Sequence, residues 1–150
     1  MSGENILVLG TQKTLMSSGA TIANNAIGQA TTATYDMIVD GGGMPNAEFY
    51  LSAPFATAPT ENTQIGLYAR PLDIDGTNDT QVPETTRPTV LIGTFTVNDV
   101  TGTQYLVLNG IEAVRLPLKA EYYLHNNGTG QSIGTGWKLV IQPCSYKAAP

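Results

Sequence analysis

Residues 64–88 read QIGLYARPLDIDGTNDTQVPETTRP, and the interpretation of this stretch decides the fold. Residues 65–70 alternate between apolar and other side chains, which predicts a strand, and a second strand is expected over 89–97. The residues between them are mostly Asp, Asn, Gly, Thr and Pro, which form turns through side-chain hydrogen bonds and positive φ angles. The sequence therefore predicts a long polar loop between two strands, and so long a loop is typical of a segment that contacts something else.

One motif in this loop indicates a different fold. Residues 73–77, DIDGT, resemble the DxDGT motif of haloacid-dehalogenase phosphatases, in which one Asp is the nucleophile and the next the general acid. That nucleophile needs a buried parallel strand, and later βα units supply the groups that hold phosphate and Mg²⁺. Pro71 removes a backbone donor from the strand concerned, and few later segments have helical periodicity. We therefore predict that the protein is not an enzyme.

The same loop can be aligned with a twelve-position calcium loop. Its carboxylates would be Asp73, Asp75, Asp79 and Glu84, and a hard cation prefers such oxygen ligands at alternate positions. Asn78 stands where the sharp turn of such a loop needs Gly, and no amphipathic helix flanks the loop. These four residues are the candidate Ca²⁺ site, but turn formation explains the segment better, and no cofactor is predicted.

Composition and charge restrict the class of protein. The chain has 150 residues, enough for one domain, and only 13% of them are charged. The net charge of −5 disfavours nucleic-acid binding, because phosphate contacts need clustered Lys and Arg. Cys144 is the only cysteine, and the N-terminus, MSGENILVLG, lacks the features of a signal peptide or membrane span. We expect synthesis in a cytoplasm and no membrane partner.

Alternating segments separated by turn residues predict an all-β fold. The fold class expected from the residues is a single-domain antiparallel all-β protein, with an N-terminal arm or edge strand over residues 1–17 and a body over 18–150. The expected strands are residues 5–9, 14–16, 35–39, 48–53, 65–70, 89–97, 104–108, 114–118, 121–125 and 137–141.

Three finer expectations concern how these segments are arranged. Residues 18–34 are small and polar, and we expect a meandering segment fixed by Ile22 and Ile27. The strand over 89–97 has apolar residues on both faces, which predicts the centre of a sheet. Asn109-Gly110 predicts a tight hairpin, and Pro143 is expected to begin a C-terminal tail.

Three aromatic residues raise the alternative of a carbohydrate-binding β-sandwich. Trp137, Tyr122 and Tyr123 are the side chains that would stack on a sugar ring. The competing interpretation places them in the core and on the outer face of a sheet. We favour this second interpretation.

Two longer stretches carry a resemblance to a known family. Residues 68–79, YARPLDIDGTND, and 120–143, AEYYLHNNGTGQSIGTGWKLVIQP, are similar to small structural proteins of tailed-bacteriophage virions, particularly capsid decoration (cement) proteins. The likeness extends loosely over residues 6–143 and includes DGGGMPNAEFYL, residues 40–51. It implies a β-sandwich or jelly-roll body, a small homo-oligomer such as a homotrimer, and a place on the outer surface of the virion capsid.

The resemblance makes the major capsid protein the expected partner. On this basis the protein clamps neighbouring capsid subunits, and the alternative is another virion component, a head fibre base or a tail protein. Because an apolar terminal arm can add a strand to a neighbour's sheet, the capsid contact is predicted at Ile6, Leu7, Val8, Leu9 and Leu15. The loop over 73–88 is expected to face a sister subunit.

Overall fold

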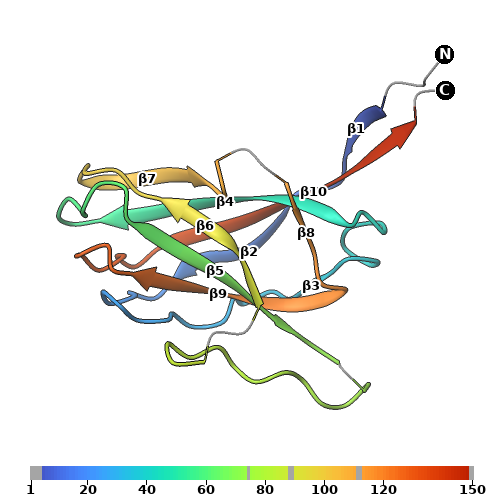
Figure 1. Ribbon diagram of the computed structural model, residues 1–150, viewed down its shortest axis with the longest axis horizontal. Helices are drawn as coiled ribbons and strands as arrows, with labels where there is room; N and C mark the ends of the chain where they lie inside the picture. Colours follow the sequence, from blue (N-terminus) through green and yellow to red (C-terminus); the bar gives the residue numbers. More distant parts are fainter. Residues whose placement is uncertain (1–4, 74, 88–89, 111–112, 149–150) are drawn as a thin grey trace.

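The computed structural model describes residues 5–73, 75–87, 90–110 and 113–148. This part of the chain forms two facing antiparallel sheets and no helix (Figure 1). The six-stranded sheet contains β1 (Asn5–Leu9), β2 (Lys13–Gly19), β4 (Asn46–Phe55), β7 (Gly102–Val107), β8 (Val114–Arg115) and β10 (Trp137–Ala148). The four-stranded sheet contains β3 (Tyr35–Asp36), β5 (Gln64–Pro71), β6 (Val90–Thr96) and β9 (Lys119–Asn127). The predicted all-β sandwich is confirmed.

The order of the strands is that of a jelly roll. One sheet has the spatial order β2-β10-β4-β7 and the other β3-β9-β5-β6, so the chain passes repeatedly between the two sheets. Two Greek keys wound together have this arrangement. It places the first and last strands of the chain side by side. In the described residues no helix is long and apolar enough to cross a membrane.

The centre of the six-stranded sheet is β10, which pairs with β4 on one side and with β1 and β2 on the other. The prediction that residues 89–97 form a sheet centre is wrong, since β6 pairs only with β5 in the described part of the fold. Val90 and Leu91 are exposed. β6 therefore buries Phe95 in the core but leaves Val90 and Leu91 in water at an edge of the sheet.

Alternate residues of β4, β5, β9 and β10 fill the space between the sheets. Phe49 of β4 contacts Tyr122 of β9, with ring centroids 5.2 Å apart. Trp137 of β10 is fully buried and packs on Gly19, where an added Cβ would lie 1.9 Å from Trp137 Cε2. Only glycine fits beneath the indole ring. The core thus joins the first and last body strands through side-chain packing as well as through pairing.

The segment 20–34 closes one side of the sandwich. Ile22 forms an isolated bridge with Ile133, and Ile27 forms one with His125, so the predicted meander fixed at two points is confirmed. The Gly28 N–H donates to the Leu124 carbonyl at 2.8 Å. This irregular segment supplies hydrogen-bond partners for backbone groups of β9, in place of a neighbouring strand.

Two predictions about chain direction are wrong. The first is the tight hairpin at Asn109-Gly110: both residues have positive φ angles, but the strands on either side, β7 and β8, each pair with β4 and not with each other. The chain also does not leave the sheet at Pro143, since β10 continues to Ala148. Pro143 keeps its place in the ladder through its carbonyl, which accepts from the Gly10 N–H at 2.8 Å.

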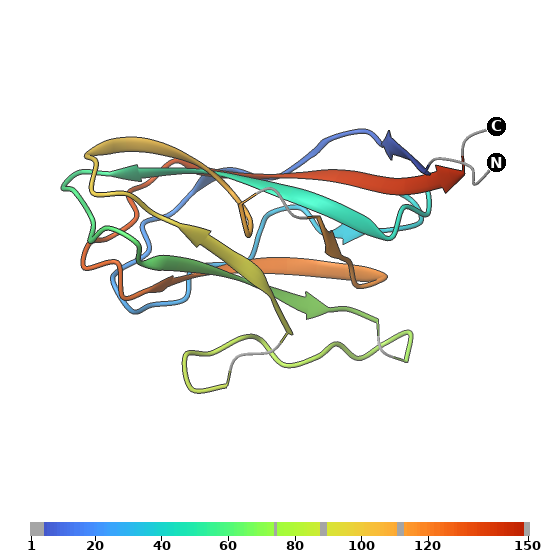
Figure 2. The ribbon, with the colours of Figure 1, turned by 45° about the horizontal axis from the view of Figure 1, so that its top comes forward.

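The described part of segment 1–17 forms edge strands of the six-stranded sheet. β2 belongs to the body, because Leu15 and Met16 are buried in the core. β1 pairs with residues 144–148 of β10, whereas β4 pairs with β10 no further than Cys144. β1 and residues 144–148 therefore project beyond the sandwich as a two-stranded ribbon (Figures 1 and 2).

Candidate functional site

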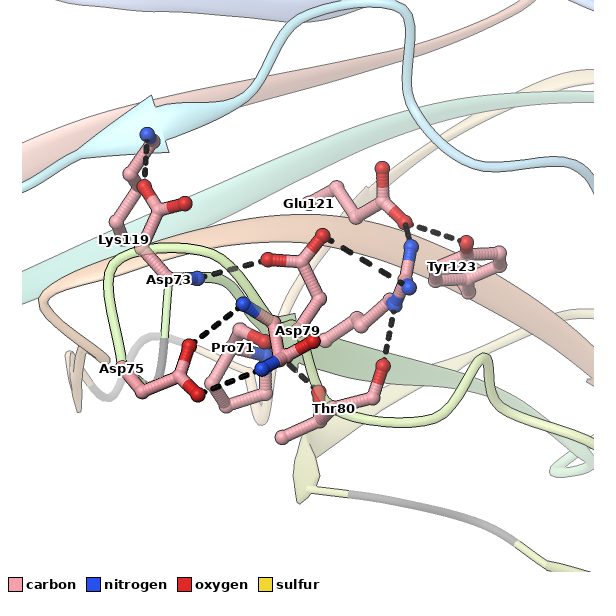
Figure 3. Close-up of polar contacts among 10 residues, drawn as sticks. Pro71, Asp73, Asp75, Asp79, Thr80, Lys119, Glu121 and Tyr123 are labelled. Atoms are coloured by element: carbon pink, nitrogen blue, oxygen red, sulfur yellow. Dashed lines mark hydrogen bonds and ion pairs between the residues drawn. The ribbon is translucent and has the colours of Figure 1, made fainter.

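The long polar loop lies on the outer side of the four-stranded sheet (Figure 2) and is attached to it by charged side chains. Arg70 of β5 donates from Nε to the Thr80 carbonyl at 2.7 Å and pairs with Glu121 of β9 at 2.8 Å (Figure 3). Lys119 forms an ion pair with Asp73, and Asp79 lies 3.9 Å from Arg70. These contacts hold both ends of residues 73–80 against the sheet.

The four candidate calcium ligands do not converge. The Asp75 carboxylate accepts from the Asn78 N–H at 2.7 Å and the Thr77 N–H at 3.0 Å, and the Asn78 N–H bond is the main reason that its pKa is lowered. Asp79 accepts from the Asp73 N–H at 2.7 Å, and Glu84 pairs with Arg87 at 3.1 Å. Within the described residues no three His, Cys, Asp or Glu side chains group as metal ligands. Each carboxylate is used by a protein donor.

The DIDGT motif has a structural explanation as well. β5 lies between antiparallel neighbours β6 and β9, which is not the parallel frame that a phosphatase nucleophile needs. Asp73 and Gly76 have positive φ angles, and the Asp75 side chain accepts from the Thr77 and Asn78 N–H groups. These are the features of an Asx turn.

The aromatic side chains considered for sugar stacking are buried. Trp137 and Tyr122 are fully buried, and Tyr123 is 5% exposed. Trp137 Nε1 donates to the Ala20 carbonyl at 2.8 Å, and the Tyr123 hydroxyl donates to Glu121 at 2.6 Å. Burial, together with that bond to Glu121, raises the pKa of Tyr123 to about 12. None of the three rings presents a free face to a sugar.

The single cysteine and the single histidine are also shielded from solvent, the first fully and the second in part. Cys144 is buried, and loss of solvent raises the pKa of its thiol. His125 of β9 is half-buried, with its ring centroid 6.0 Å from that of Tyr68, and burial lowers its pKa. At neutral pH the thiol is protonated and the imidazole is neutral. Both states suit packing against a sheet.

The ribbon places apolar side chains in water on both of its faces. Leu7 is opposite Tyr146 and Ile6 is opposite Lys147, and successive residues of a strand point to opposite faces. Ile6, Leu7, Leu9 and Tyr146 are 47–63% exposed, and Val8 is half-buried. Four of the five predicted capsid-contact residues thus lie together on β1. The fifth, Leu15, is fully buried in the core and is not part of this surface.

A neighbouring loop adds to the exposed apolar surface of the ribbon. Ile38 and Val39 are 61% and 80% exposed, and Leu118, before β9, is 68% exposed. The Met37 N–H donates to the Leu118 carbonyl at 2.7 Å, and Lys13 pairs with Asp40 at 2.8 Å, close to the base of the ribbon. Both views show these segments at the end of the sandwich from which the ribbon projects (Figures 1 and 2).

We call this surface the apolar end. It contains seven of the twelve exposed large hydrophobic residues in the described part of the chain, namely Ile6, Leu7, Leu9, Ile38, Val39, Leu118 and Tyr146. The last four were not predicted from the sequence. Residues 35–39 were expected to form one strand, but β3 ends at Asp36, whose carboxylate accepts from the Ile38 and Val39 N–H groups at 2.9 and 3.0 Å. The Asp residues on either side of the exposed pair were the available signal for a turn.

A shallow groove crosses the outer face of the six-stranded sheet. It is lined by residues that include Tyr50, Tyr105, Val107, Lys138 and Val140, and its volume is about 290 Å³. Ligand pockets usually measure about 300–1,000 Å³ and enclose most of the ligand. The groove is just below that range, and Tyr105, one of its lining residues, is 82% exposed.

No protein-family model matches this chain, and neither a curated protein nor a solved structure matches it. The function proposed below therefore depends on the resemblance described above and on the surfaces of this molecule.

Proposed function

We propose that this protein is a virion structural protein that binds the outer surface of a tailed-phage capsid and stabilises contacts between major capsid protein subunits. The observation that carries the proposal is the apolar end, where most of the exposed large hydrophobic residues of the described chain gather. Exposed apolar side chains that gather at one end of a monomer are typical of a site for another protein. The resemblance to decoration proteins supports the major capsid protein as the partner.

The geometry of the apolar end suits a protein partner better than a small ligand. The ribbon projects from the body and has apolar side chains on both faces, so it can enter a crevice between two other surfaces. On this proposal the crevice lies between neighbouring capsid subunits. A jelly-roll body is also common among capsid and lectin domains, although a fold alone does not define a function.

The expected affinity of one copy is modest. Complete burial of a large apolar side chain contributes about 1.5–3 kcal/mol, so covering seven half-exposed side chains contributes roughly 7 kcal/mol. Association costs about 4–15 kcal/mol of translational, rotational and ordering entropy. The net free energy of binding through a single contact is therefore close to zero. Many linked copies on a regular shell would bind far more tightly through avidity.

The remaining expectations belong to the same proposal. The protein is made in the host cytoplasm, assembles as a small homo-oligomer, for which the resemblance implies a homotrimer, and ends on the virion surface. Its acidic net charge suits a basic patch on the capsid.

Co-sedimentation with capsids of the phage that encodes the chain tests the proposal. Leu9→Asp places a charge in the proposed contact, and we expect binding to fall at least tenfold. Val100→Asp is the matched control, because Val100 is 57% exposed against 60% for Leu9 but is outside the apolar end. Equal loss in both variants, or no binding by the unaltered protein, would refute the proposed contact. Protein recovered with purified tails would favour a tail component instead.

A further inference from the structure

The outer edge of β1 has backbone groups with no neighbouring strand in the described part of the fold. β1 pairs with β10 alone, with Leu9 opposite Cys144 and Leu7 opposite Tyr146. The next pair, Gly10 with Pro143, is hydrogen-bonded, since the Gly10 N–H donates to the Pro143 carbonyl. Because hydrogen-bonded and non-hydrogen-bonded pairs alternate in an antiparallel ladder, the N–H and C=O groups of Asn5, Leu7 and Leu9 are directed away from β10.

This edge also lacks the usual protection against strand pairing. Natural edge strands carry charges, prolines or bulges that block a further strand. β1 reads NILVL and has none of these, whereas residues 145–148 at the other edge of the ribbon include Lys147. The two edges of the ribbon therefore differ, and that of β1 is the one open to pairing.

We infer that β1 pairs antiparallel with β1 of a second copy of this chain, about a two-fold axis at Leu7. This register places Leu7 opposite Leu7 and Asn5 opposite Leu9. All three outward-directed residues then meet outward-directed residues, so every pair can exchange hydrogen bonds. The strand has no charge to repel its copy. Pairing the chain with itself thus satisfies the whole free edge in one register.

The result is a four-stranded intermolecular sheet, β10-β1-β1-β10. A two-stranded ribbon alone is marginally stable in water, and more strands stabilise it. Only the edges are used, so the faces of the ribbon and the residues of the loop over 37–44 stay accessible. The inference therefore does not depend on capsid binding. It does predict a dimer, whereas the resemblance implies a homotrimer.

Sedimentation equilibrium of the purified chain, from micromolar to millimolar concentration, measures the association. We expect a monomer–dimer equilibrium, because a contact of this size is small for a protein interface. Leu7→Pro removes the outward N–H but leaves the β1–β10 ladder intact, and should weaken the dimer at least tenfold. Leu7→Val keeps the N–H and should change the dissociation constant less than threefold. A monomer at all concentrations, a trimer, or equal association of the two variants overturns the inference.

Cysteine cross-linking tests the register separately. In a hydrogen-bonded antiparallel pair the Cα atoms are about 5.5 Å apart, within disulfide range. Leu7→Cys should therefore form a covalent dimer under mild oxidation. Ile6→Cys is equally exposed, 47% against 48%, but lies off the axis and should form far less. Equal cross-linking of both variants, or dominant cross-linking of Ile6→Cys, contradicts the two-fold axis at Leu7.

Discussion

The β9 edge of the four-stranded sheet is covered by another segment of the chain, whereas the β1 edge of the ribbon is open. Beyond the short strand β3, β9 is covered by the segment 20–34, in which the Gly28 and Thr31 N–H groups donate to the Leu124 and Tyr122 carbonyls at 2.8 and 2.9 Å. β1 has no such cover in the described part of the chain. One edge is thus covered by a dedicated segment, whereas the other is uncharged, apolar and open. This difference is the basis for proposing that the open edge pairs with another chain.

The difference also separates stability from binding. The closed side contributes to the core, whereas the ribbon contributes little to it: Leu15 and Met16 of β2 are fully buried, but Ile6, Leu7 and Leu9 of β1 are about half exposed. Changes in the body should therefore alter the free energy of unfolding. Changes in the ribbon should alter association and leave the body folded.

Truncation should give the largest effect. Removal of residues 1–9 deletes β1 and the residues before it, and we expect the melting temperature to change by a few degrees at most. Removal of residues 1–17 also deletes Leu15 and Met16 from the core. Each such loss costs about 2–5 kcal/mol, and whole domains have only about 5–15 kcal/mol of stability. The longer truncation should be unfolded, and circular dichroism measures this. A folded body in that variant would show that β2 is dispensable.

The closed side should respond to the loss of one buried amide. Asn126 donates from Nδ2 to the Ile22 and Gln131 carbonyls at 3.2 and 2.7 Å, and its Oδ1 accepts from Thr129 at 2.6 Å. Asn126→Ala removes these three hydrogen bonds. The Ile22 carbonyl keeps the Ile133 N–H at 2.9 Å and the Gln131 carbonyl keeps the Thr129 hydroxyl at 2.9 Å, so we expect a cost of about 1–3 kcal/mol. Denaturant unfolding measures this change. The exposed neighbour gives the control, Asn127→Ala, with an effect within about 0.5 kcal/mol. Similar effects of the two substitutions would mean that the amide does not fix the closing segment.

The smallest expected effect is a pH dependence in the polar loop. Hydrogen bonds from Asn78 and Thr77 lower the pKa of Asp75 below its ordinary value of 3.8. A lowered folded-state pKa contributes stability above pH 3.8, and this contribution disappears as the pH falls through the folded-state pKa. Carboxyl-detected NMR titration should give a midpoint for Asp75 below 3.8, and the signals of the ribbon should not follow it. A midpoint at or above 3.8 would show that the turn does not stabilise the carboxylate.

The sequence predicted those strands in which apolar residues alternate because every second side chain is buried. β4, β5 and β10 were each located, because their alternate residues, such as Phe49, Leu67 and Leu139, face one core. Sheet position could not be read in the same way. β6 has the apolar composition of a central strand yet lies at an edge, since composition does not reveal which strands are its neighbours.

The candidate site was only partly predictable. The apolar run on β1 identified the ribbon residues, but its pairing with residues 144–148 was hidden because Pro143 is typical of a strand end. Leu15 looked equivalent to Leu9, and only the packing of the core distinguishes them. Ile38, Val39 and Leu118 are far from β1 in sequence, and the jelly-roll winding brings them to the same end.

The most direct test of the proposed function is electron cryomicroscopy of capsids mixed with the protein. We predict β-rich density on the outer shell, bridging neighbouring subunits, with the ribbon and the rest of the apolar end against the capsid. A shell that stays bare under saturating protein, or density in which the opposite end of the sandwich, at the β6–β7 turn, faces the capsid, would contradict this account.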